Sequence, residues 1–218
     1  MMTQDQTSRT PRWVRKLLIP AMIGAVAGFA ASGGIIAFID SSAVGGLSKS
    51  GMIAAVIAVL YALIGFGITI GTASPQWGAR FLNVEDADEL REQKRILMLS
   101  GFAMLLWGAA LLALALAAPD GPLPQPTAAA ISGCGLLIGI ALSVQVYRAS
   151  DELMAAVNLE AGALSYGLLS VVLGGWAMSA HLGYAAPPRP LELLSLFYVL
   201  VLVASFIAVG RRGMLAIR

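Results

Sequence analysis

The chain has 218 residues, of which 58% are hydrophobic and 12% are charged, and its net charge is +2. Soluble domains carry about 25% charged residues, so this composition indicates an integral membrane protein and excludes an ordinary soluble domain. The small net charge is divided among short segments and forms no basic groove, so we expect no nucleic-acid partner.

Residues 1–16 are polar and basic, and we interpret them as a cytosolic arm with Trp13 as an interfacial anchor. The apolar segment at 17–39 is longer than a signal-peptide core of about 7–15 residues and lacks a convincing cleavage site. It is therefore predicted to be a retained first membrane span. Gly24, Gly28 and Ser32 are spaced four apart, which places them on one helix face and permits close helix packing.

The second predicted span is 51–72, with Gly67 and Gly71 as packing positions near its end. A polar stretch follows and ends at residue 95. Its charged residues are a candidate interaction surface on the cytosolic side: Asp88, Glu89, Arg91, Glu92, Lys94 and Arg95. The acidic pair Asp88–Glu89 is predicted to begin a long helix, because carboxylates complement the unpaired N–H groups at a helix start.

The third and fourth spans are predicted at 96–118 and 127–146, with Gly135 and Gly139 as packing positions in the fourth. A second Asp-Glu-Leu segment, 151–153, begins the fifth helix, for which Ser150 is the expected cap. Unbroken to residue 180, this helix would be about 45 Å long, against a hydrocarbon core of about 30 Å. Its first turns should therefore protrude, leaving a span at 161–180 that contains Gly174. The sixth span is 191–210.

Six spans predict an all-α polytopic membrane protein: a six-transmembrane-helix bundle (17–212) with two helices extended into the cytosol and a cytosolic tail (213–218). With a cytosolic N-terminus, the inner segments hold twelve Lys and Arg residues, while the outer loops hold only Lys49 and Arg189. This asymmetry follows the positive-inside rule, so we expect both termini in the cytosol. The cell membrane, specifically a bacterial inner membrane, is the expected location, with anionic lipid at the cytosolic face.

The two Asp-Glu-Leu segments lie 63 residues apart and hold equivalent places, each before an outward-going span. A duplicated helical hairpin would explain this arrangement. So would two independent helix starts, since little matches beyond the tripeptide.

No predicted span carries a charged residue near its centre, although ion-coupled transporters usually need one there. Glu160 lies at the inner boundary of the fifth span, and we interpret it as an interfacial carboxylate that faces head groups or a neighbouring arginine. In the alternative, Asn158 and Glu160 line an inner vestibule or bind a partner. Asp151 and Glu152 belong to the same polar helix start.

The sequence contains no Gly-x-Ser-x-Gly, no His-Glu-x-x-His and no phosphate loop ending in Lys-Ser/Thr. His181 stands alone, and the acidic residues do not have the dense spacing of a cation loop. We therefore predict no catalytic residue, no metal site and no cofactor.

These observations favour a non-enzymatic scaffold, assembly factor or accessory subunit that acts through helix packing and a charged cytosolic face. Its expected partner is another membrane protein or a second copy of the chain. The alternative is a small-solute permease with a site between the two Asp-Glu-Leu hairpins. A membrane enzyme comes third, because no nucleophile, base or metal set converges.

Overall fold

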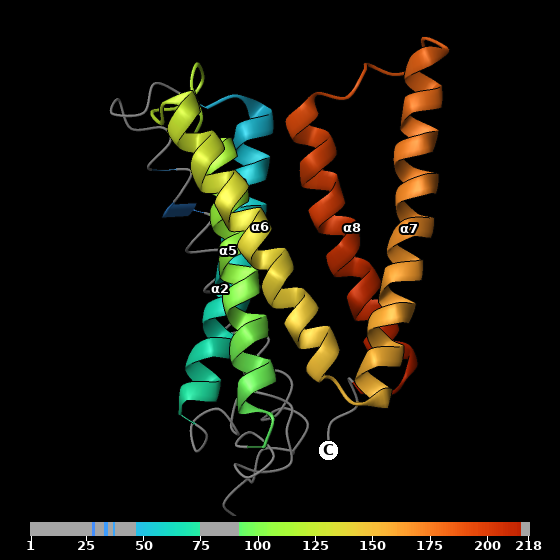
Figure 1. The fold of residues 1–218 in the computed structure, drawn as a ribbon. Helices are drawn as coiled ribbons and strands as arrows, with labels where there is room; N and C mark the ends of the chain where they lie inside the picture. The colour runs from blue at the N-terminus through green and yellow to red at the C-terminus, as the bar shows by residue number, and fades with distance from the viewer. Residues whose placement is uncertain (1–27, 29–32, 35–36, 38–46, 75–91, 215–218) are drawn as a thin grey trace, which may run out of the picture.

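The computed structural model describes residues 28, 33–34, 37, 47–74 and 92–214, and the fold they form is all-helical (Figure 1). Its long helices are α2 (Lys49–Ala73), α5 (Lys94–Ala115), α6 (Gln125–Ala149), α7 (Glu152–His181) and α8 (Pro190–Arg211). All five are long and apolar enough to cross a membrane, which indicates a multi-pass membrane protein. They coincide with the predicted second to sixth spans.

Several predicted features lie outside the described residues. They are the basic arm, most of the first span at 17–39 including Gly24 and Ser32, the charged residues Asp88, Glu89 and Arg91, and the last four residues of the tail.

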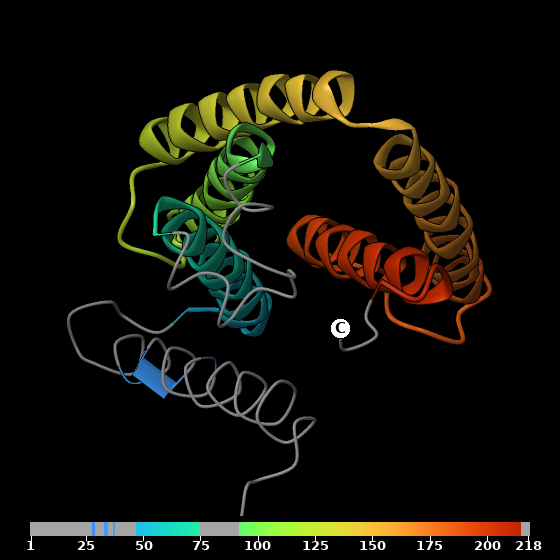
Figure 2. The same ribbon diagram turned by 90° about the horizontal axis from the view of Figure 1, so that it is seen from below.

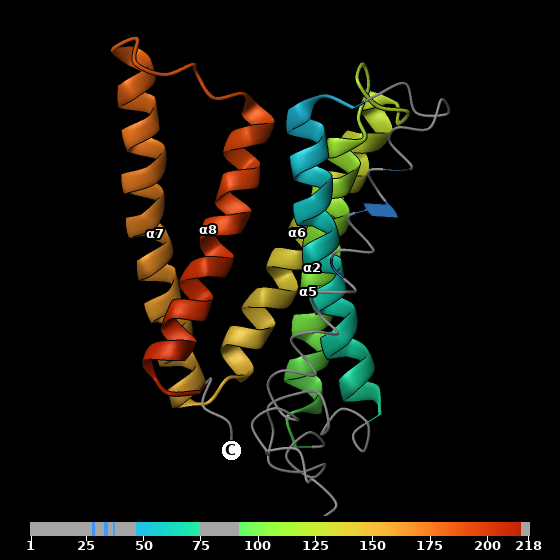
Figure 3. The same cartoon turned by 180° about the vertical axis from the view of Figure 1, so that it is seen from behind.

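Successive helices run in opposite directions, so the described bundle has two distinct ends (Figures 1 and 3). At one end α2, α6 and α8 finish while α5 and α7 begin; we call it the Arg211 end. At the other end α2 and α8 begin, and we call it the Arg189 end. The connections at 150–151 and at 182–189 therefore lie on opposite sides of the bundle.

Helix α7 begins behind a side-chain cap, as its sequence predicts, but the capping residue is Asp151. The Asp151 carboxylate accepts a hydrogen bond of 2.7 Å from the Met154 N–H. Ser150, the expected cap, instead donates its hydroxyl to the Val146 carbonyl and so belongs to the end of α6. At the far end Gly183 adopts a φ of +81°, a left-handed conformation that glycine adopts without strain and that ends the helix.

Helix α5 begins later than the acidic pair predicts. Its first residue is Lys94, it has no acidic residue in its first turn, and a turn at Gln93 separates it from Glu92. The prediction that Asp88 and Glu89 begin the third spanning helix is therefore wrong. Both residues precede Lys94 by more than one turn, where a carboxylate no longer complements the first N–H groups of the helix.

The closest helix pair is α2 and α5, which meet through small residues spaced seven apart. In antiparallel order the facing pairs are Gly51 with Ala115, Ala58 with Gly108, and Gly65 with Gly101. A Cβ atom added at Gly65 would lie 2.8 Å from the Gly101 carbonyl oxygen, and one at Gly108 would lie 2.8 Å from the Ala58 carbonyl oxygen. The two backbones therefore touch, which maximises dispersion contact where no hydrophobic effect separates helix from lipid. The spacing of seven is that of a left-handed helix pair.

Helix α6 packs on α5 along only part of its length. Its buried residues are Ala128, Ser132, Gly135 and Gly139, all in the half nearer the Arg189 end. A Cβ at Gly135 would lie 3.0 Å from the Leu106 carbonyl oxygen, and Gly139 lies directly against the Trp107 ring. Beyond Gly139 the helix leaves α5 and runs toward the start of α7 (Figure 2).

Helices α7 and α8 form a hairpin that joins the other three helices mainly through α8 (Figure 2). The Tyr61 hydroxyl of α2 donates to the Tyr198 carbonyl at 2.9 Å, and the Tyr198 hydroxyl donates to the Trp107 carbonyl at 3.1 Å. The two tyrosine rings meet edge to face with centroids 4.9 Å apart. Both rings are buried, so this cluster links α2, α5 and α8 at the centre of the described core.

Candidate functional site

A cavity of about 540 Å³ lies between the three-helix group α2–α5–α6 and the hairpin α7–α8. It opens where α6 leaves α5, and each of the five spanning helices contributes to its wall. Tyr61 and Trp107 lie on the wall nearest the aromatic cluster, while Val209 lies near the Arg211 end. Most of the surface is aliphatic or aromatic, which suits an apolar occupant.

The few polar groups of this cavity are largely committed within their own helices. The Ser143 hydroxyl donates to the Gly139 carbonyl and the Ser205 hydroxyl donates to the Val201 carbonyl, each at 2.9 Å. Asn158 of α7 brings a carboxamide to the edge of the cavity and is exposed. The indole N–H of Trp107 is buried and has no hydrogen-bond partner in the described part of the chain.

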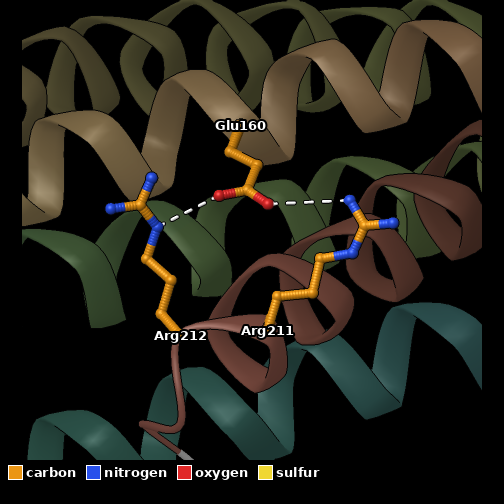
Figure 4. A network of polar contacts seen from close by, with 3 residues as sticks. All are labelled: Glu160, Arg211 and Arg212. Atoms are coloured by element: carbon orange, nitrogen blue, oxygen red, sulfur yellow. Dashed lines mark hydrogen bonds and ion pairs between the residues drawn. The ribbon is translucent and has the colours of Figure 1, made fainter.

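Glu160 lies outside this cavity and binds two arginines at the end of α8 (Figure 4). Its carboxylate accepts a hydrogen bond of 3.0 Å from the Arg212 Nε–H, and its other oxygen lies 3.7 Å from Arg211 Nη1. The Glu160 side chain is only 26% exposed. The contacts hold the start of α7 against the end of α8, so of the two residues considered for a vestibule only Asn158 lines a cavity.

The remaining charged residues of the predicted interaction surface are placed as follows. Glu92, Lys94 and Arg95 are exposed around the start of α5, and Glu152 is exposed in the first turn of α7. Asp151 caps that turn. Among the described residues, no group of three or more His, Cys, Asp or Glu side chains is arranged to hold a metal ion.

The glycines predicted to mediate helix packing fall into two groups. Gly135 and Gly139 lie against α5, and Gly71 is buried in α2. Around Gly28, Gly67 and Gly174, no described atom lies within 4 Å of an added Cβ. The closest contacts involve Gly65, Gly101 and Gly108, which the sequence reading did not single out; their signal was a spacing of seven shared with Ala58 and Ala115.

A second row of small residues on α7 has no neighbour among the described helices. The row is Ala163, Gly167, Ser170, Gly174 and Ala177, and all five positions are exposed. Steps of four and three residues keep the row on one helix face. Gly167 and Gly174 offer open space where the glycines of α5 meet carbonyl oxygens. Only Val157 and Ser165 are buried along the whole of α7.

The structure thus offers two features for recognition near the Arg211 end and along α7: an apolar cavity with one carboxamide at its edge, and an open small-residue face. Comparison of the chain with family models, with curated proteins and with solved structures finds no match.

Proposed function

We propose that the protein is a non-enzymatic membrane scaffold, an assembly factor or accessory subunit, whose α7 helix binds a transmembrane helix of a partner protein or of a second copy. The observation that carries this proposal is the open row Ala163, Gly167, Ser170, Gly174 and Ala177 on an otherwise sparsely packed helix.

The physical basis is the way in which membrane helices associate. Lipid tails are as apolar as leucine, so helices gain little from burying large apolar side chains against one another. They gain from close backbone approach, which small residues permit. This chain already uses a seven-residue spacing of small residues to join α2 to α5, and the same kind of face on α7 is unused within the described residues.

The proposal places the protein in the cell membrane, as a bacterial inner-membrane protein with six spans, the first at 17–39, and both termini in the cytosol. Support comes from the described basic residues near the two ends of the bundle. Five lie at the Arg211 end (Lys94, Arg95, Arg148, Arg211 and Arg212), and two lie at the Arg189 end (Lys49 and Arg189). The positive-inside rule puts the richer end in the cytosol, where the polar start of α7 extends beyond the lipid.

Association in mild detergent and in nanodiscs tests the proposal. The double variant Gly167→Leu/Gly174→Leu should fold, because both added side chains enter open space. It should lose the co-purifying partner or the dimer, with affinity reduced about tenfold or more, equivalent to about 1.4 kcal/mol.

Gly162→Leu is the matched control. Gly162 is equally open, but it lies about 100° around the helix from the row. It should leave association unchanged. A wild-type chain that is monomeric and partner-free in native membranes, by crosslinking as well as after purification, would contradict the proposal.

A small-solute permease remains the second candidate function, and the cavity of about 540 Å³ favours it. Its aliphatic wall points to an apolar or weakly polar solute. In proteoliposomes, Ser143→Leu should then block flux by filling the cavity, and Asn158→Ala should change selectivity. Equal flux in wild-type and Ser143→Leu vesicles would remove this candidate.

A further inference from the structure

A second cavity, of about 880 Å³, lies at the Arg189 end between the starts of α2 and α8. Trp176 of α7 borders it, with its indole N–H donating to the Ala186 carbonyl at 3.0 Å. This volume lies within the usual range for ligand sites, about 300–1,000 Å³. It shares no lining residue with the cavity at the Arg211 end.

Ser195 marks this cavity as a polar site with an unmet hydrogen bond. It is 3% exposed and lines the cavity, and its hydroxyl has no partner in the described part of the chain. Ser165, Ser179 and Ser205, also on α7 and α8, each donate to the carbonyl four residues earlier. A buried hydroxyl without a partner is destabilising, so its persistence is explained by a ligand that accepts its hydrogen bond.

The mouth of the cavity is cationic. Lys49 is the first residue of α2, and Arg189 immediately precedes α8. Neither side chain forms an ion pair within the described ranges. Glu192 also lines the cavity, but its carboxylate accepts a hydrogen bond of 2.9 Å from the Arg189 backbone N–H and so serves the start of α8. Two cations against one carboxylate leave an excess positive charge, which the N-terminal dipole of α2 increases.

The deeper wall of the same cavity is hydrocarbon. Ile53 and Ile57 of α2 face Leu196 and Val199 of α8 across it, one to two turns further into the spanning segments than the cations. A small soluble anion would use the mouth and leave this wall bare. A ligand with an anionic head and an alkyl tail would use both parts.

We propose that this cavity binds an anionic phospholipid. Its phosphate oxygens are held by Lys49, Arg189 and the Ser195 hydroxyl, and part of one acyl chain lies along the aliphatic wall between α2 and α8. The proposal does not depend on the scaffold function, because it concerns the opposite end of the bundle from the charged helix starts and a different surface from the α7 row.

Native mass spectrometry of the full chain, released from nanodiscs of phosphatidylcholine and phosphatidylglycerol, tests the site. Wild type should retain one phosphatidylglycerol in preference to phosphatidylcholine. Lys49→Gln/Arg189→Gln should weaken retention about 10- to 30-fold, the effect expected for two basic residues near a membrane surface. The matched control is Lys94→Gln/Arg148→Gln, two exposed basic residues at the Arg211 end, which should keep the retained lipid.

Ser195→Ala separates binding from folding. Without lipid, this variant should melt at a higher temperature than wild type, because the unpartnered hydroxyl is gone. With phosphatidylglycerol it should gain less thermal stability than wild type does, because binding to the folded state is weaker. A variant that is stabilised by lipid as strongly as wild type would refute the role of Ser195.

Two other outcomes would overturn the proposal. Equal retention of the two lipids by wild type would show that the cavity does not select a charge. Displacement of the retained lipid by inorganic phosphate at millimolar concentration would identify a soluble anion as the ligand instead.

Discussion

The α2–α5 pair and the α7 helix carry the same kind of sequence pattern and have opposite environments. In the pair, Gly65, Gly101 and Gly108 bring two backbones into contact. On α7, Gly167 and Gly174 face open space within the described structure. A row of small residues therefore permits close approach but does not choose the neighbour. That choice depends on connectivity and on which other faces of the bundle are already occupied.

The largest expected effect is at the closed interface. Gly108→Leu places its Cβ where the Ala58 carbonyl oxygen lies within 2.8 Å, and a backbone atom cannot move aside as a flexible side chain can. We expect a loss of about 3 kcal/mol or more in the free energy of unfolding, the upper part of the range for overpacked cores. Denaturation with SDS in mixed micelles measures it. Gly167→Leu, the same change at an open site, should unfold like wild type; equal losses would erase the distinction between the two rows.

The next effect concerns how α7 is held. Glu160→Gln removes the carboxylate that Arg211 and Arg212 share, so the start of α7 should loosen from the end of α8. Because Arg211 is 63% exposed, most of the loss should come from the Arg212 hydrogen bond, and we expect about 1–2 kcal/mol. Hydrogen exchange over residues 152–160 should rise. Glu152→Gln, an exposed control, should leave exchange unaltered, and no change in Glu160→Gln would mean that α8 packing alone holds α7.

A smaller effect is expected where α8 meets the closed pair. Tyr61→Phe removes the hydrogen bond to the Tyr198 carbonyl but keeps the ring contact. Interhelical hydrogen bonds in membranes contribute about 0.6 kcal/mol on average, so the free energy of unfolding should fall by roughly that amount. Tyr166→Phe, at a residue 76% exposed, is the control for loss of a hydroxyl. A loss above about 2 kcal/mol would show that the tyrosine cluster acts as a coupled network.

The smallest effect has the opposite sign. Gly174→Ala adds a methyl group in open space, and alanine favours the helix over glycine by up to about 1 kcal/mol in water. We expect a gain below about 0.5 kcal/mol, because glycine is better tolerated in membrane helices than in soluble ones. The thermal unfolding temperature in detergent should rise slightly. A clear destabilisation would mean that the α7 row is already covered in the folded chain.

Much of the fold could be predicted from sequence because bilayer thickness imposes a length on each apolar segment. The predicted second to sixth spans agree with α2, α5, α6, α7 and α8 to within a few residues at most ends. The start of α5 was misplaced because an acidic pair favours a helix start without specifying which of two adjoining helical segments it begins. The cap of α7 was misplaced by one residue for a related reason, since serine and aspartate are both good caps.

The candidate site was much less predictable. The spacing of Gly101, Gly108 and Ala115 was visible in the sequence, but the same spacing on α7 led to no contact. Glu160 was expected to face either head groups or an arginine, and only the antiparallel placement of α7 beside α8 brings Arg212 within 3.0 Å of it. Ser195 carried no signal at all, because a serine inside an apolar helix normally bonds to its own backbone.

Composition, segment length and the position of breakers by themselves determined that this chain is helical, that it crosses a membrane several times and where most crossings begin and end. These properties depend on local transfer energies and on the need to satisfy backbone hydrogen bonds within each segment. The tertiary structure alone decided which small-residue faces close, where α6 departs to open a cavity, and which hydroxyl is left without a partner. Those outcomes depend on how helices distant in sequence fit together, and the energies that select one arrangement are differences in contact that no single segment contains.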